Sequence, residues 1–213
     1  MAMGASLAWA VFVALVPVLK SGTISVYSPA NLRHIRNQLR VKELQPRADL
    51  HRERLRASWS EASPPSWSGS YRHSDGFEHL DLDLGADGFY YEAHNCTGTT
   101  ELGWGKVAGV EGTLVRLEIQ EHVIVERPSP DEDRRQRFRF STELYVVPWG
   151  KEHFLVPAEL MEEFCSLAKA GRWDSMTYAD YPRRVEPGES VWDRPHFDGL
   201  PDVPTEFRKY LPH

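Results

Sequence analysis

Strict alternation of apolar and polar side chains in the middle of the chain constrains its fold more than any other feature. Residues 79–84 alternate between leucine and a histidine or aspartate, which is typical of a strand with one buried face. Further alternating or apolar runs occupy 89–93, 101–110, 115–119, 137–140, 144–149 and 153–156. Short strands joined by short turns predict an antiparallel β-meander that closes, or nearly closes, into a small barrel. Gly103 and Gly105 are expected to weaken the strand that contains them.

One helix is predicted directly after the strands. Pro157 suits the first helical position, Lys169 lies in the last turn, and Gly171 stands just past the end. The apolar side chains of this segment repeat at helical spacing: Leu160, Met161, Phe164, Leu167 and Ala168. We expect the helix to pack against the barrel or to close one of its ends.

The N-terminal segment carries no charged side chain from Met1 to Leu19, and the 13 residues from Leu7 onward are wholly apolar. As a helix, residues 1–19 would reach roughly 28 Å, close to the thickness of a bilayer's hydrocarbon core. We interpret residues 1–27 as a single-pass transmembrane anchor; a cleaved signal peptide and a buried helix are the alternatives. The anchor would present these side chains to lipid: Leu7, Trp9, Phe12, Leu15 and Leu19.

A basic segment follows the apolar one. Residues 33–56 hold eight basic and three acidic side chains, whereas residues 57–213 carry a net charge of −12. Ser28-Pro29 predicts a helix start, and Leu32, Ile35 and Leu39 form an apolar stripe with Arg33, Arg36 and Arg40 on the other side of the helix. Such a helix suits an anionic membrane surface or a partner, although a solvated linker fits as well. We expect Pro46 to end this helix and residues 48–57 to form a second one.

The last 42 residues, 172–213, are rich in proline and show no strong periodicity. They carry more aromatic side chains than a disordered tail would. We predict an extended strap that docks on the domain or on another subunit, with a last short helix near 204–211. Six aromatic residues are the candidate contacts: Trp173, Tyr178, Trp192, Phe197, Phe207 and Tyr210.

No motif in the sequence predicts catalysis, a metal centre or a cofactor. Asp83 begins an acidic loop, but Gly85 and His94 stand where a calcium-binding loop needs oxygen ligands. His79 and His94 could meet across a hairpin, yet no zinc-ligand spacing occurs. Cys165 sits on an apolar helix face and is expected to be a buried thiol. The acidic domain argues against nucleic acid as a partner.

The order of elements resembles that of lipocalin-like small β-barrels. Trp67-x-Gly-x-Tyr71 opens the region, a meander of hairpins follows, and a helix packs outside. The segments at 145–150, 154–157 and 200–204 are similar to those of uncharacterised bacterial envelope proteins. The resemblance covers about residues 67–211 and implies a fold type but no activity.

These observations predict a mainly β protein with four parts: an anchor at 1–27, a helical tether and linker at 28–66, a β domain at 67–171 and a strap at 172–213. The function we expect is that of a non-enzymatic accessory or interaction subunit of a membrane protein assembly. It would be a single-pass protein of a bacterial inner membrane, with the charge distribution favouring a cytoplasmic domain. The alternatives are a barrel that binds a small apolar ligand and, third, a hydrolase.

Overall fold

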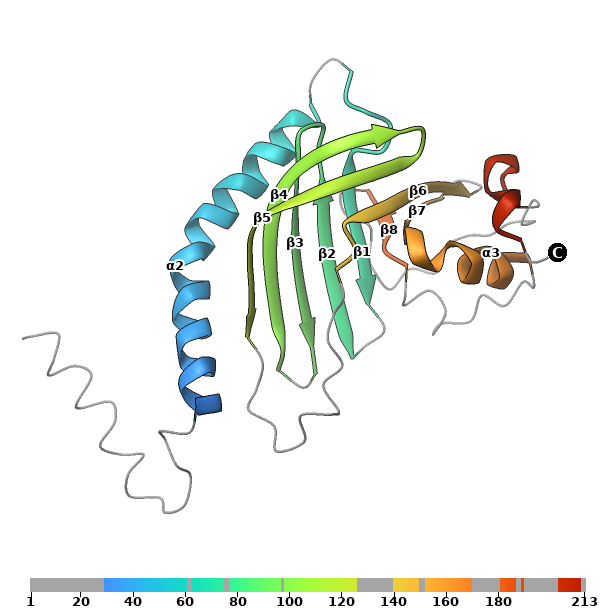
Figure 1. The fold of residues 1–213 in the computed structure, drawn as a ribbon. Helices are drawn as coiled ribbons and strands as arrows, with labels where there is room; N and C mark the ends of the chain where they lie inside the picture. Colours follow the sequence, from blue (N-terminus) through green and yellow to red (C-terminus); the bar gives the residue numbers. More distant parts are fainter. Residues whose placement is uncertain are drawn as a thin grey trace, which may run out of the picture.

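The computed structural model describes residues 29–60, 63–74, 77–96, 98–125, 140–149, 152–169, 181–186, 189 and 203–211. Eight antiparallel strands form a closed barrel in which each strand pairs with its sequence neighbours and the last pairs with the first (Figure 1). The strands are β1 (Gly69–Ser74), β2 (Glu78–Leu84), β3 (Gly88–Asn95), β4 (Thr100–Glu111), β5 (Leu114–Val125), β6 (Glu143–Trp149), β7 (Glu152–Pro157) and β8 (Arg183–Val185). The predicted mainly β class and antiparallel barrel are confirmed.

The strand that closes the barrel comes from the segment we expected to be a strap. In β8, Val185 pairs with Ser70 of β1, and Arg183 pairs with Phe154 of β7. Three residues are too few to show alternation in a sequence, so only this pairing reveals the strand. The strand predicted at 137–140 falls almost entirely outside the described residues.

Gly103 and Gly105 do not interrupt β4, which runs as one strand from Thr100 to Glu111. They stand directly opposite Tyr91 and Phe89 on β3. A Cβ atom added at Gly105 would lie 2.0 Å from the backbone oxygen of Glu118 on β5 and 2.8 Å from Cε1 of Phe89, so the glycine allows a close approach of β5 and makes room for a buried ring. Register shifts beside Gly105 and Gly109 mark irregularities that let the long β4–β5 hairpin bend around the barrel.

The helix α2 (Pro29–Ser58) runs as one element of 30 residues along the outside of the barrel (Figure 1). The prediction that Pro46 ends the helix and that 48–57 forms a separate one is therefore wrong. Proline removes one hydrogen bond from a helix interior. Contacts with the barrel on both sides of Pro46 offset that loss, and they come from one apolar cluster: Leu44, Ala48 and Leu55 of α2 with Tyr90, Leu102, Trp104 and Val123 of the barrel wall.

A buried carboxylate connects the end of α2 to the barrel wall. Asp83 on β2 has no solvent exposure and accepts hydrogen bonds from Nε of Arg52 (2.5 Å) and Nε of Arg56 (3.0 Å). Ser70 donates a third, at 2.7 Å, from β1. Trp59, just past the helix, donates from its indole nitrogen to the carbonyl of Leu84 at 3.0 Å. Charge-assisted bonds of this kind are stronger than neutral ones, so they fix the position of the helix.

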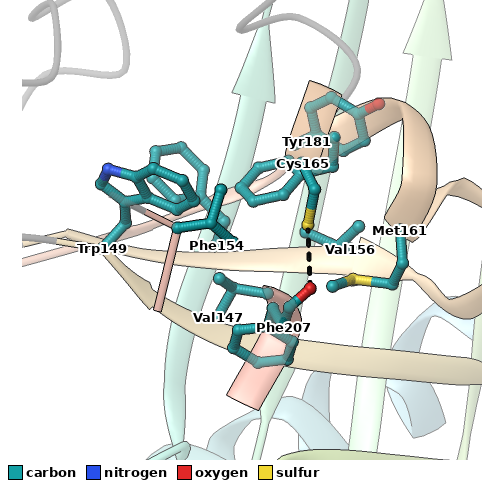
Figure 2. Close-up of a cluster of buried hydrophobic side chains, with 10 residues drawn as sticks. Val147, Trp149, Phe154, Val156, Met161, Cys165, Tyr181 and Phe207 are labelled. Atoms are coloured by element: carbon teal, nitrogen blue, oxygen red, sulfur yellow. Dashed lines mark hydrogen bonds between the residues drawn. The ribbon is translucent and has the colours of Figure 1, made fainter. Parts of the chain in front are cut away.

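The helix predicted after the strands is confirmed as α3 (Met161–Lys169), preceded by a single 3-10 turn, η3 (Ala158–Leu160). It packs on the outer face of β6 and β7, and does not close a barrel end. The short helix η5 (Thr205–Tyr210) packs against it, as Figure 2 shows for Phe207 beside Cys165. The two elements and the strands enclose one apolar cluster: Val147, Trp149, Phe154, Val156, Met161, Phe164, Cys165, Tyr181, Val203 and Phe207.

The inner face of the barrel holds a second apolar cluster. Tyr71, Leu84 and Phe89 have no solvent exposure, and Leu82, Tyr91 and Leu155 are nearly as buried. Phe140 stacks on Tyr91 with ring centroids 3.9 Å apart. Large side chains therefore fill the barrel where β2 and β3 meet. The barrel wall separates this interior cluster from the two outer clusters, one against α2 and one against α3.

Candidate functional sites

The anchor residues lie outside the described part of the chain. Leu7, Trp9, Phe12, Leu15 and Leu19 all precede Pro29, where the description begins. Among the helices that are described, none is both long enough and apolar enough to cross a bilayer. The anchor therefore remains a prediction from the sequence.

The outward face of α2 carries the apolar stripe that the sequence predicted. Leu32, Ile35, Leu39 and Leu50 are 48%, 43%, 62% and 47% exposed. At 3.6 residues per turn, these positions and Pro46 fall within about 60° of one another, roughly opposite the side that packs on the barrel. The barrel thus buries one apolar face of α2 and leaves a second one in solvent.

The same end of α2 carries three basic side chains, Arg33, Arg36 and Arg40. Arg33 and Arg36 are exposed, as the tether interpretation requires. Arg40 turns toward the barrel, where its Nη2 lies 3.1 Å from Oε2 of Glu121 on β5. That pair is exposed, and exposed pairs contribute little to stability. The structure therefore leaves two of the three predicted tether arginines in solvent and pairs the third within the chain.

The strap residues divide into two groups. Trp173, Tyr178, Trp192 and Phe197 lie outside the described residues. Phe207 is 2% exposed in the cluster against α3, and Tyr210 donates from its hydroxyl to that of Tyr145 at 2.6 Å. Phe207 and Tyr210 therefore make their contacts within this chain.

A polar group that the sequence analysis missed lies on the inner face of the barrel. Glu101 on β4 is 2% exposed, and its Oε1 accepts a hydrogen bond from the hydroxyl of Tyr91 at 2.8 Å. Nε2 of His122 on β5 lies 2.6 Å from the same oxygen. Burial, and then the negative charge of Glu101, raise the pKa of Tyr91 far above its ordinary value. Only the register of β3, β4 and β5 brings these residues together, so no local sequence pattern could predict this group.

A histidine held by a carboxylate is one component of a hydrolytic site, and a nucleophile is another. Within the described part of the chain, no serine, threonine or cysteine side chain hydrogen-bonds to His122. The group therefore has the form of a satisfied interior network, in which a buried acid has two donors.

The two histidines that we expected to meet across a hairpin do so on the outer face. His79 and His94 are direct partners in the β2–β3 ladder. Each lies beside its own carboxylate, His79 at 3.3 Å from Asp81 and His94 at 3.0 Å from Glu92. The hydrogen bond between His94 and Glu92 raises the pKa of the histidine and lowers that of the glutamate. In the ranges that the structure covers, no three His, Cys, Asp or Glu side chains are grouped so that they could hold a metal ion.

The two cysteines do not form a disulfide. Cys96 is exposed and Cys165 is buried, and both are free. Burial raises the pKa of the Cys165 thiol to about 11, which keeps it protonated and unreactive at neutral pH. The fold places one cysteine directly after β3 and the other in α3.

Comparisons with protein-family models, with curated proteins and with solved structures find no match to this chain.

Proposed function

We propose that this chain is a non-enzymatic accessory subunit of a bacterial inner-membrane assembly, and that α2 rests on the lipid surface. The observation that carries the proposal is the outward stripe of α2, which stays exposed although the opposite face of the helix is buried. A surface helix of a soluble barrel needs only one apolar face. A second one, on a helix that also carries the exposed Arg33 and Arg36, suits the boundary between lipid headgroups and acyl chains.

The position of α2 in the sequence supports the same function. The apolar run ends at Leu19, and α2 begins at Pro29. The nine residues between them span at most about 30 Å when fully extended. An anchor in the bilayer would therefore hold the first turns of α2 close to the headgroups, on the side where the positive-inside rule favours basic residues.

The free energy that α2 would gain at the membrane surface is of the size needed to orient the barrel there. Burying a half-exposed leucine or isoleucine contributes about 1 kcal/mol. Each arginine near an anionic surface contributes about 1 kcal/mol more. These terms sum to a few kcal/mol, enough to set how the barrel lies on the membrane once an anchor keeps it there.

A lipocalin-like barrel that binds a small apolar ligand inside is the alternative, and it has less support. The interior positions between β2, β3 and β1 are occupied by Leu84, Phe89 and Tyr71, none of which has solvent exposure. Side chains that already fill this part of the barrel leave a ligand to bind elsewhere.

Lipid-quenching fluorescence on the full chain tests the proposal. A bimane label is attached at Leu39→Cys, or at Val110→Cys as a matched control, in a Cys96→Ser background. Val110 is 45% exposed and lies on β4, away from α2. In vesicles that contain anionic lipid and doxyl-labelled acyl chains, we expect quenching at position 39 and little at position 110. Equal quenching at the two positions would refute the membrane contact of α2.

A further inference from the structure

The barrel holds α2 unevenly along its length. The second half of the helix supplies Leu44, Ala48 and Leu55 to a buried apolar cluster. In residues 29–43, by contrast, none of the side chains whose burial the structure describes is fully buried. The free energy that comes from burying apolar surface therefore acts almost wholly on the part of α2 that begins at Leu44.

Polar contacts with β5 hold the first half of α2. Nδ2 of Asn37 donates to the carbonyl oxygen of Ile124 at 2.6 Å, and Nη2 of Arg40 lies 3.1 Å from Oε2 of Glu121. The side chains of this ion pair are 54% and 25% exposed, and exposed pairs contribute little to stability. The second half has a stronger hold, because its arginines bond to Asp83, which has no solvent exposure.

Glu121 also lies near an arginine of the second half. Its Oε1 is 4.0 Å from Nη1 of Arg47. If Arg40 moves away, the carboxylate keeps this second partner and its contact with water. Releasing the first half of α2 therefore leaves no buried charge without a partner, which is the condition that makes breaking an ion pair costly.

Pro46 makes the helix easiest to bend between its two halves. It has no N–H to donate to the carbonyl of Lys42, and its ring crowds that carbonyl. Sharp bends in helices occur mostly at prolines. Pro46 is exposed, and α2 bends near its middle, as Figure 1 shows. The turn from Lys42 to Pro46 is thus a hinge, and the buried Leu44 within it is the pivot.

We propose that α2 is a hinged arm: residues 29–40 swing about the turn that ends at Pro46, while residues 47–58 stay fixed on the barrel. The arm is closed in this structure, where Asn37 contacts Ile124. When the arm opens, that contact breaks and the carbonyl of Ile124 is exposed to water.

The hinge affects how the barrel can be presented to a surface. Leu32, Ile35 and Leu39 are exposed and lie on the swinging part of α2. Whatever surface holds these side chains, the hinge lets the barrel change its tilt relative to that surface. The inference does not depend on the membrane contact proposed above, because it concerns contacts within the chain alone.

Distances between two spin labels, measured by pulsed electron paramagnetic resonance on the full chain in neutral detergent, test the hinge. One label is attached at Lys106→Cys, an exposed position on β4 that pairs with Gly88 of β3 and Glu118 of β5. The other is attached at Arg36→Cys in the first half of α2, or at Arg54→Cys in the second half as the matched control. Both arginines are exposed.

The two label positions on α2 have similar lever arms. Positions 36 and 54 lie about 12 and 15 Å along the helix from Leu44. A change of about 20–30° at the hinge moves position 36 by about 4–6 Å. With the exposed thiol removed by Cys96→Ser, we expect a broad or two-peaked distance distribution for the 36–106 pair and a narrow one for the 54–106 pair.

Variants and salt separate the hinge from other sources of motion. Pro46→Ala restores the missing N–H, so it should reduce the 36–106 distribution to one narrow peak. Asn37→Ala removes the bond to Ile124 and should increase the share of displaced distances. About 1 M salt should act in the same direction, because it screens the exposed pair of Arg40 and Glu121. The 54–106 distribution should not respond to any of these changes.

Two results would overturn the proposal. The first is a 36–106 distribution as narrow as that of the 54–106 pair. The second is a broad 36–106 distribution that Pro46→Ala, Asn37→Ala and salt all leave unchanged, because the spread would then arise outside the hinge.

Discussion

Replacing Asp83 with asparagine should destabilise the protein strongly, because this residue connects α2 to the outer face of the barrel. The carboxylate has no solvent exposure and accepts bonds from Arg52, Arg56 and Ser70 at 2.5, 3.0 and 2.7 Å. Asparagine has nearly the same volume, so the substitution removes the negative charge without opening a cavity. It leaves the guanidinium of Arg52, whose side chain is 18% exposed, facing a neutral amide.

The magnitude follows from the two arginines. Removing one member of a buried ion pair costs about 3–5 kcal/mol, because the remaining charge stays in a poorly solvated place. Arg52 keeps Asp81 at 3.3 Å and the ring of Tyr90 at 4.6 Å, which places the cost at the lower end of that range. Arg56 is 42% exposed and regains water, so its share is small. We expect a loss of about 3 kcal/mol in the free energy of unfolding.

Urea unfolding followed by tryptophan fluorescence measures this loss. Asp87→Asn, an exposed acid in the β2–β3 turn, is the matched control and should change the stability by less than about 0.5 kcal/mol. A double-mutant cycle with Arg52→Gln should give a coupling energy of about 2 kcal/mol. A loss below about 1 kcal/mol for Asp83→Asn, with no coupling to Arg52, would refute the view that this carboxylate holds α2 on the barrel.

Two further predictions concern packing. Gly105→Ala should cost about 3 kcal/mol or more, because the added Cβ would lie 2.0 Å from the backbone oxygen of Glu118 and 2.8 Å from Phe89, whereas Gly109→Ala, with nothing within 4 Å of the added Cβ, should be nearly neutral; equal urea midpoints for both variants would contradict the role given to Gly105. Phe207→Ala should cost about 3–5 kcal/mol, because the ring is 2% exposed between η5 and α3. Lys209→Ala is its exposed control, and a Phe207→Ala variant as stable as that control would show that η5 does not support the fold.

The strands show why part of this fold can be predicted from the sequence. In β2 and β3 every second side chain enters the barrel, and the pattern is local, so Leu82 and Leu84 reveal their face without knowledge of any neighbour. The strand β8 has only three residues and depends on β1 and β7 for its existence. Its sequence looks like the proline-rich chain around it.

The helix α2 shows a different limit. Local rules end a helix near a proline, and they failed at Pro46 because the barrel wall holds the residues on both sides of it. The same rules found the exposed stripe of Leu32, Ile35 and Leu39. They did not reveal the other apolar face of α2, which the barrel buries through Leu44, Ala48 and Leu55.

The candidate sites follow the same division. Arg52, Ser70 and Asp83 are separated by 18 and 13 positions in the sequence, and no motif connects them. Glu101, Tyr91 and His122 likewise meet only through the ladder of β3, β4 and β5. The spacing of residues in a sequence predicts contacts within one helix or strand, but it does not predict contacts between the strands of a sheet.

The sequence by itself determined the alternation that makes this a β protein and the helix that ends at Lys169. It also determined the apolar run at the N-terminus and the basic segment that follows it. Each of these features arises from residues only a few positions apart. The tertiary structure alone decided which strand closes the barrel, which face of α2 stays in solvent and which arginines bond to the buried Asp83. Those outcomes depend on distant segments competing to bury the same surfaces, and that competition is settled only when the whole chain is packed.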